Sequence, residues 1–341
     1  MEIVGVAAAP VSFGVFGLPD QASPWGRDAE LLLRAIASAG YDGTELGPPR
    51  FFGPPERVRG RLADHGLRLA GAYIPLHLAD PRFRDGDFRA MRQTLEELAE
   101  GGPSLAILAD WGSKELMANP ARPWNERTLA LDDRAWRTAE ETLRQALAIV
   151  SAFDIEATFH PHIATYVESP WEITRLLETV DIGLTVDTGH IFLAGASPTE
   201  LLQSWRRRVN HVHLKDVRTA VMDQAKAEGR DDFEGWWASV ACPLGEGDVD
   251  LNGFVQGLRD VDYRGWLVVE QDRAFAGREE FEAIAREQAR NNLWVRDRLS
   301  PDEVQQAVQT RVNRVEPRDD RDVLADSARR RPGASRGSSS P

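Results

Sequence analysis

The chain has little cysteine: Cys242 is the single thiol among 341 residues. One thiol cannot form an intramolecular disulfide, and such a composition is typical of a reducing compartment. Cys242 precedes Pro243 in an expected loop, and we interpret it as incidental because a lone cysteine needs a base to become a nucleophile. We therefore predict a cytoplasmic protein that is stabilised by its core rather than by covalent cross-links.

Long apolar runs and an excess of positive charge are also lacking. No apolar stretch approaches the roughly 18 residues of a membrane helix. The apolar start of the chain contains Glu2 and no basic segment, so we interpret it as a first strand rather than a signal peptide. The formal net charge of -13 at pH 7 repels phosphate backbones and anionic membranes. We expect neither nucleic acid nor a membrane among the partners.

Short β-rich runs alternate with longer stretches of helical periodicity along the chain. Strands are expected near residues 3–9, 43–46, 67–74, 104–109, 154–160, 182–187, 209–214 and 265–270. Helices are expected near residues 27–40, 55–65, 86–101, 132–152, 170–180, 198–208, 250–260 and 278–298. "SPWE" (169–172) and "SPTE" (197–200) each supply a helix N-cap, a proline at the first turn and a glutamate at the third position.

Eight strand–helix units favour a closed parallel (β/α)8 barrel, a TIM barrel. An open doubly wound sheet would more often show a glycine-rich phosphate turn after its first strand, and "APVSFGVFG" lacks the G-x-G-x-x-G spacing. We predict one barrel domain over residues 1–300, with long loops at 110–131 and 215–249 after the fourth and seventh strands. The extension 301–341 is charged and then rich in serine, glycine and proline, so we expect disorder from about 315.

Potential metal ligands gather at the expected strand ends. Five of the seven histidines lie there, and so do two acidic residues; the set is His160, His162, His190, His211, His213, Asp187 and Glu270. A barrel brings these strand ends to one face. A carboxylate at the mouth of a barrel is costly unless it is paired or bound to a metal. Individually, each histidine could be a packed core residue and Asp187 a helix N-cap.

Taken together, Asp187, His213 and Glu270 supply a mixed nitrogen and oxygen ligand set. Such a set suits manganese, magnesium or cobalt better than a closed structural zinc site. Strand alternation sends His211 and His213 to the same face, with His211 deeper as a packed partner. The sequence therefore predicts a divalent-metal site at the carboxyl-terminal end of the barrel.

Several motifs resemble those of one enzyme superfamily. They are "GTELG" (43–47), "HPHIATYVES" (160–169), "DTGH" (187–190), "NHVHLKDVR" (210–218), "GEGDVDL" (245–251) and "VVEQD" (268–272). Over roughly residues 1–300 the chain resembles the xylose-isomerase-like barrels of sugar isomerases and epimerases. Within that superfamily it is most similar to inosose dehydratases, which remove water from 2-keto-myo-inositol.

The resemblance implies a divalent metal held by Glu, Asp, His and Glu. Asp187, His213 and Glu270 match the last three, but Thr158 stands near the position of the first. We expect Glu168 to substitute as the fourth ligand, with His160 or His162 as the alternative. Manganese or cobalt is the expected metal, and magnesium or zinc the alternative.

The implied reaction starts when a base removes the proton α to the ketone, and the metal stabilises the anion that forms. A general acid then protonates the departing β-hydroxyl. The candidates for acid and base are His162, His190 and Lys215. Lys215 could instead pair with Asp216 at the surface, and His190 could instead hold Asp187 in place.

Four residues are expected to bind substrate: Glu45, His160, Asp272 and Trp111. Alternatively, Glu45 could form a structural salt bridge at the barrel mouth. Trp111, Trp236 and Trp237 lie in the two insertions, where they would stack on a sugar or pack a subunit interface in a homo-oligomer.

A cyclic keto-polyol such as inosose is thus the expected substrate of a metal-dependent dehydratase. The alternatives are a ketose 3-epimerase or isomerase, and a lyase acting on a 3-keto-glycoside. An apurinic-site endonuclease would need more metal ligands and a basic groove. A non-catalytic sugar-binding barrel would not need a metal site.

Overall fold

A computed structural model describes residues 1–15, 28–123, 125–230, 233–274, 277–300 and 302–303. Its main sheet contains only parallel pairs, in the order β3-β2-β1-β11-β8-β7-β6-β5-β4. The strands are β1 (Glu2–Ala8), β2 (Gly43–Thr44), β3 (Arg68–Leu69), β4 (Gly71–Leu76), β5 (Leu105–Asp110), β6 (Glu156–Phe159), β7 (Gly183–Asp187), β8 (Val209–Leu214) and β11 (Arg264–Val269).

Strands β3 and β4 are two parts of one barrel strand, joined at Ala70. The Ala70 amide donates to the Thr44 carbonyl oxygen at 2.9 Å, and the Leu105 amide donates to the Ala70 carbonyl oxygen at 3.2 Å. These bonds join the β2 side to the β5 side, so the sheet closes on itself with eight strands. The predicted (β/α)8 barrel is therefore confirmed.

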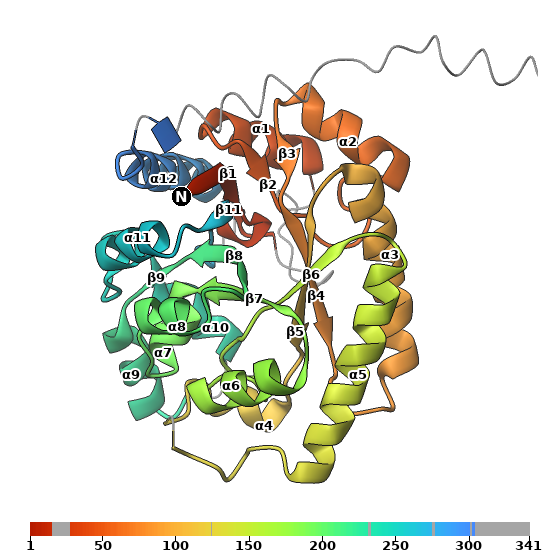
Figure 1. The fold of residues 1–341 in the computed structure, drawn as a ribbon. Helices are drawn as coiled ribbons and strands as arrows, with labels where there is room; N and C mark the ends of the chain where they lie inside the picture. The colour runs from red at the N-terminus through yellow and green to blue at the C-terminus, as the bar shows by residue number, and fades with distance from the viewer. Residues whose placement is uncertain (16–27, 124, 231–232, 275–276, 301, 304–341) are drawn as a thin grey trace, which may run out of the picture.

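A helix follows each barrel strand and covers its outer face (Figure 1). The outer helices are α1 (Ala29–Ser38), α2 (Pro55–Asp64), α3 (Arg84–Gly101), α5 (Asp133–Ser151), α6 (Pro170–Thr179), α8 (Pro198–Ser204), α11 (Leu251–Asp260) and α12 (Arg278–Arg296). Asp132 caps α5 by accepting the Ala135 amide, and Ser169 with Glu172 forms the expected capping box of α6. Helix α8 ends at Ser204, four residues before the predicted end.

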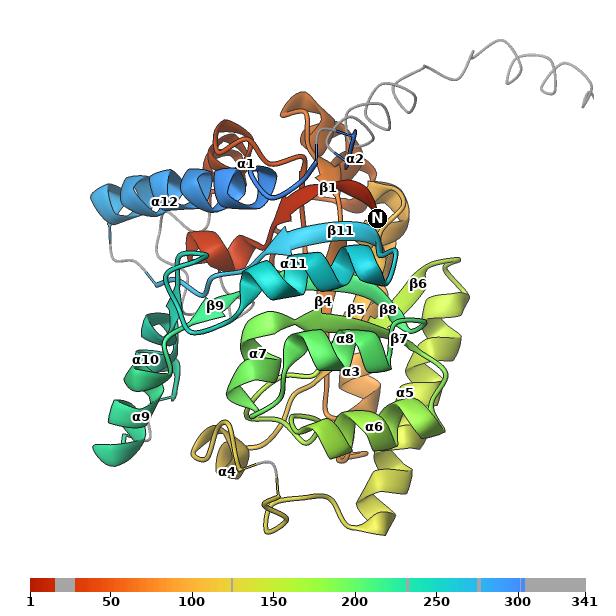
Figure 2. The same cartoon turned by 60° about the vertical axis from the view of Figure 1, so that its left-hand side comes forward.

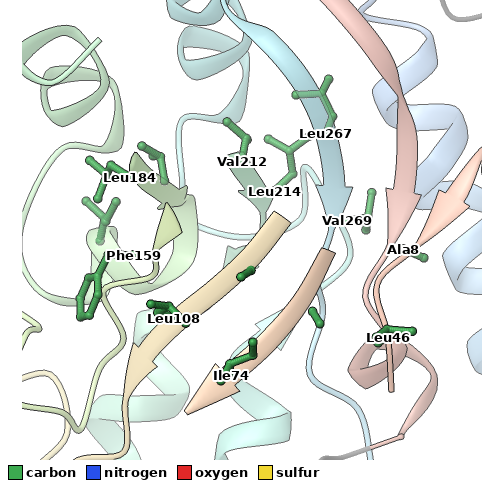
Figure 3. Close-up of a cluster of buried hydrophobic side chains, with 14 of the residues drawn as sticks. Ala8, Leu46, Ile74, Leu108, Phe159, Leu184, Val212, Leu214, Leu267 and Val269 are labelled. Atoms are coloured by element: carbon green, nitrogen blue, oxygen red, sulfur yellow. The ribbon is translucent and has the colours of Figure 1, made fainter. Parts of the chain in front are cut away.

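The outward faces of the strands form the larger core. Val212, Leu214, Leu184 and Leu267 are fully buried and belong to this cluster (Figure 3). These large aliphatic side chains remove apolar surface from water and attach the helices to the barrel.

A smaller apolar cluster lies in the barrel lumen, with the Trp266 ring toward the amino-terminal ends of the strands. Trp266 packs there with Ala7, Ala9, Ala70 and Val268. A Cβ atom at Gly5 would lie 2.7 Å from the Trp266 ring, and one at Gly43 would lie 2.8 Å from it. The indole fills the lumen near the amino-terminal ends of the strands. A site would therefore lie at the carboxyl-terminal ends, where the active sites of barrel enzymes are found.

Both predicted insertions lie at the carboxyl-terminal ends of the strands (Figure 2). The first contains α4 (Lys114–Met117). The second folds into an antiparallel hairpin of β9 (Asp216–Val217) and β10 (Ala241–Cys242), with α9 (Thr219–Ala227) and α10 (Phe233–Val240) between them. Two short helices, η1 (Pro10–Phe13) and α7 (Thr188–Leu193), directly follow β1 and β7.

The predicted extension 301–341 lies almost entirely outside the described residues, and so does its expected disorder. Within the described part of the chain, no helix is both long enough and apolar enough to cross a bilayer.

Candidate active site

Four neighbouring strands deliver one polar side chain each to the mouth of the barrel. His160 follows β6, Asp187 ends β7, His213 lies near the end of β8 and Glu270 follows β11. The backbone ladder continues through them, because the His160 amide donates to the Leu108 carbonyl and Asp187 is the ladder partner of His213. Strand pairing therefore fixes these side chains at one height in the lumen.

The four side chains form a compact buried cluster that could hold a metal ion. One ligand atom from each lies within 4.8 Å of all the others. His213 Nδ1 is 2.6 Å from Glu270 Oε2 and 3.2 Å from His160 Nε2. Asp187 Oδ2 is 3.7 Å from a nitrogen of each imidazole.

Asp187 Oδ2 provides the test of fit. This oxygen is buried and has no hydrogen-bond partner among the residues that the structure describes. A buried carboxylate oxygen without a hydrogen bond is costly, whereas the two imidazoles and two carboxylates of this cluster, Asp187 included, make a suitable donor set for a divalent ion. The residues present therefore fit a metal, and Asp187 Oδ2 is the atom that most needs one.

Glu168 is not brought to this cluster, contrary to the sequence-based expectation, and His160 occupies the corresponding place. Both Glu168 oxygens accept backbone amides at 2.6 Å, one from Ala164 and one from Arg122. The Arg122 guanidinium also lies 3.8 Å from the carboxylate. Burial raises the pKa of Glu168 to about 7, although Arg122 opposes the shift. Its carboxylate is thus engaged by two loops behind the site.

Glu45 lies behind His213 rather than in open space. Its Oε1 atom is 2.9 Å from His213 Nε2 and 2.8 Å from His211 Nε2. Burial would raise the pKa of Glu45, but the charge of His213 and the hydrogen bonds from both histidines lower it to about 2. Glu45 therefore stays ionised and holds the edge of the His213 ring that points away from the cluster.

Lys215 is fully buried among carboxylates. Its Nζ atom lies 2.7 Å from Glu270 Oε1, 2.9 Å from Asp272 Oδ2 and 3.6 Å from Asp187 Oδ2. Burial lowers the pKa of Lys215, but these three negative charges outweigh it and raise the pKa well above its usual value. The alternative of a surface pair is not seen, because Lys215 faces the lumen.

Asp272, predicted to bind substrate, stands beside the ammonium group of Lys215. Burial raises its pKa, against the opposing charge of Lys215 and a hydrogen bond from Trp237. Asp216, the other candidate partner of Lys215, instead accepts the backbone amides of Gly245 and Gly247 in the second insertion.

His190 is a neutral acceptor in this arrangement. Lys215 Nζ lies 3.0 Å from His190 Nε2, and because an ammonium group has only donors, the imidazole nitrogen must accept. Burial lowers the pKa of His190 well below its usual value, and the charges of His162 and Lys215 lower it further. Trp237 stacks on the ring, with centroids 5.4 Å apart and planes inclined by 12°. His190 thus orients Lys215.

His162 presents an unprotonated nitrogen at the site. Its Nδ1 atom lies 2.7 Å from the Ile163 carbonyl oxygen, which can only accept, so Nδ1 carries the hydrogen and Nε2 keeps its lone pair. Burial lowers the pKa of His162 to about 3, with His160 and Lys215 adding to the shift. Its ring centroid lies 3.8 Å from that of His190. The geometry and the lowered pKa together leave Nε2 of His162 unprotonated at neutral pH.

The β4–β5 side of the lumen is open and aromatic. Tyr73 is 42% exposed although it lies within a strand, and its ring makes an edge contact with His160 at 6.0 Å. Trp111 is 36% exposed and stacks on His77 at 5.4 Å. Tyr73 was not among the site residues predicted from the sequence. Alternation could have placed it in the lumen, but not beside open space.

Comparisons with known proteins identify the family of the chain. Residues 33–297 match the family model described as the xylose isomerase-like TIM barrel. An inosose dehydratase of Geobacillus kaustophilus is 30% identical over 289 residues, which are 83% of this chain and 92% of that protein. A rhizopine catabolism protein of Rhizobium meliloti is 30% identical over 250 residues, covering 72% of this chain and 74% of the relative.

Solved structures show the same fold at low sequence identity. A D-allulose 3-epimerase from Methylomonas sp. matches with a TM-score of 0.62 and 14% identity, covering 88% of this chain and 99% of that one. A probable 3-DHS dehydratase from Bacillus anthracis matches with a TM-score of 0.59 and 16% identity, covering 84% and 97%. As its motifs predicted, the chain belongs to the xylose isomerase-like TIM barrel family.

Proposed function

We propose that this protein is a metal-dependent dehydratase of a cyclic keto-polyol of the inosose type, with His160, Asp187, His213 and Glu270 as the metal ligands. The observation that carries the proposal is the clustering of four ligand atoms, one of them an Asp187 oxygen, together with the absence of a hydrogen bond to the buried Asp187 Oδ2 among the described residues. The 30% identity to an inosose dehydratase over most of both chains supports the substrate class. Manganese or cobalt fits a set of two imidazoles and two carboxylates better than magnesium does.

A bound divalent ion would act as a Lewis acid on the ketone oxygen and stabilise the negative charge that proton loss creates. The protein supplies the proton transfers. His162 Nε2 accepts the proton from the carbon next to the ketone, since its Nδ1 is already bonded to Ile163. Lys215 Nζ, protonated among its carboxylates, donates a proton as the carbon–oxygen bond of the β-hydroxyl breaks and water leaves.

The substrate sits, in this proposal, between the polar wall of β7, β8 and β11 and the aromatic wall of β4 and β5. Tyr73 and Trp111 offer ring faces and edges to the apolar C–H face of the polyol. His190 holds Lys215 through its accepting Nε2. The hydrogen bonds of His162, Lys215 and His190 are thus consistent with the separate role proposed for each.

The direct test strips the protein with a chelator, restores manganese or cobalt, and adds 2-keto-myo-inositol. We expect a metal-dependent rise in ultraviolet absorbance from the conjugated product, together with loss of water. A parallel reaction in deuterium oxide reports proton abstraction.

Deuterium incorporation without elimination would reassign the protein as a keto-sugar epimerase or isomerase. A metal-loaded protein that gives neither signal would refute inosose as substrate, and a 3-keto-glycoside would be tried next. A protein that binds no divalent metal would contradict the assigned ligand set.

Replacing Glu45 by glutamine should weaken metal binding without removing a ligand. A ligating histidine usually donates its other ring N–H to a carboxylate, and loss of that carboxylate typically costs 10–100-fold in metal affinity. We expect this range for Glu45→Gln in calorimetric titration of the apo protein with manganese. Glu56→Gln makes the same charge change at an exposed position in α2 and should leave the affinity unchanged. Equal affinity of both variants would show that Glu45 does not orient His213.

A further inference from the structure

The turn that follows β6 has an unusual backbone that is held from outside. Ala164 adopts a left-handed conformation with φ of 64°, which residues other than glycine rarely adopt. The turn is closed by bonds from the His162 amide to the Val167 carbonyl at 3.3 Å and from Thr165 Oγ1 to the His162 carbonyl at 2.7 Å. A backbone in this conformation persists where its surroundings determine it.

Glu168 supplies one of the determining contacts. Its Oε2 atom accepts the Ala164 amide at 2.6 Å, which satisfies the donor of the left-handed residue itself. Its Oε1 atom accepts the Arg122 amide at 2.6 Å from the first insertion, next to Ala121, which is also left-handed with φ of 50°. The Arg122 guanidinium then donates to the Thr165 carbonyl at 3.1 Å. One buried carboxylate thus joins two loops.

Asp110, at the end of β5, supplies the second contact. Its Oδ2 atom accepts the Tyr166 amide at 2.8 Å and the Gly112 amide at 3.1 Å. Gly112 packs so closely on the turn that a Cβ atom there would lie 2.3 Å from the Ala164 carbonyl oxygen. The turn and the start of the first insertion are therefore held by the same carboxylate.

The consequence reaches the site through His162. The His162 ring is oriented by its Nδ1 bond to the Ile163 carbonyl, and Ile163 directly precedes Ala164. We propose that Glu168 and Asp110 are positioning residues, which lock the turn 162–168 to the first insertion and so direct His162 Nε2 toward the substrate. The proposal rests on the proposed function for the role of His162, but not for the lock itself.

The lock also explains how the first insertion contributes to the site. Arg122 lies twelve residues beyond Asp110, and both meet the same turn. Lys226 of α9 donates to the Ala121 carbonyl at 3.0 Å, so the second insertion is attached to the first at the same place. The contacts that place the two insertions are therefore connected to the contacts that hold the turn carrying His162.

Glu168→Gln is the decisive variant. Both carboxylate oxygens accept N–H groups, so an amide in this place must turn its NH2 group toward one of these donors. We expect exchange of the Ala164 or Arg122 amide with deuterium to accelerate at least tenfold. We also expect nitrogen NMR to show loss of the single Nδ1–H tautomer of His162. With 2-keto-myo-inositol, kcat should fall at least tenfold while KM and the manganese Kd change by less than about threefold.

Glu172→Gln is the matched control, because it makes the same side-chain substitution in the same buried cluster around Arg122. Glu172 bonds Arg122, Ser169 and the Glu168 amide, but not the amides of residues 162–166. We expect a similar fall in thermal stability with the His162 tautomer retained. If the two variants behave alike in tautomer and kcat, the role of Glu168 is merely structural and the proposal is overturned.

Two further outcomes would also overturn it. A loss of manganese affinity above a hundredfold in Glu168→Gln would make Glu168 a ligand. Faster amide exchange with an unchanged His162 tautomer would separate the turn from the ring. A wild-type protein that is inactive on 2-keto-myo-inositol would contradict the proposed function, while exchange and tautomer measurements would still decide the lock.

Discussion

Replacement of Asp187 by asparagine is expected to abolish metal binding and turnover while leaving the barrel folded. Asp187 has two separable tasks: Oδ1 accepts the His190 amide at 2.9 Å as the N-cap of α7, and Oδ2 lies in the donor cluster. Asparagine caps helices about as well as aspartate, so the first task is kept. An NH2 group in place of Oδ2 cannot ligate a cation and would face the imidazole nitrogens.

The expected loss in kcat/KM is on the order of a thousandfold or more, because metal stabilisation of the developing charge contributes several kcal/mol and each 1.36 kcal/mol is about tenfold in rate. Calorimetric manganese titration, the coupled ultraviolet assay and thermal unfolding would be measured on one preparation. Asp132→Asn is the control, since it makes the same change at the exposed N-cap of α5. Unchanged manganese affinity in Asp187→Asn would remove the basis for the cluster.

Replacement of Lys215 by methionine should have the largest effect on stability. The ammonium group is fully buried and compensates Glu270, Asp272 and Asp187. Removing one partner of a buried ion pair leaves uncompensated charge and typically lowers the free energy of unfolding by about 3–5 kcal/mol. Loss of the proton donor should lower kcat by roughly 10²–10⁴-fold. Urea unfolding of the apo protein and the ultraviolet assay would measure the two effects.

The manganese affinity of Lys215→Met should also differ from that of the wild type. With the ammonium group gone, the carboxylates repel one another and no cation opposes an incoming ion, so manganese should bind more tightly than to the wild type and restore part of the lost stability. Lys114→Met, at the exposed start of α4, is the control and should change neither quantity. Wild-type stability and activity in Lys215→Met would show that this group neither neutralises the carboxylates nor donates the proton.

Much of the fold was predictable because its signals are local. The periodicity of apolar residues in a helix or strand depends only on neighbours in the sequence. Eight strand–helix pairs identified in this way predict a barrel. The break at Ala70 and the β9–β10 hairpin were not predictable. Strands of two residues are too short to show alternation, and their pairing is set by distant partners.

The histidines and acids at the strand ends were also predictable, since all parallel strands of a barrel end on the same face. Alternation placed His211 and His213 on one face, and the structure puts both in the lumen, sharing Glu45. Glu168 was misplaced because it belongs to a turn. The direction of its side chain depends on the left-handed Ala164, and alanine carries no sequence signal for that conformation.

The sequence by itself therefore determined the barrel, its two insertions and the chemical types gathered at its mouth. These follow from periodicity and from the common direction of parallel strands. Only the tertiary structure decided that His160 joins Asp187, that Lys215 is surrounded by carboxylates and that Tyr73 faces open space. The reason is physical: which buried groups share a hydrogen bond or a charge depends on distances across the lumen, between residues that the sequence keeps far apart.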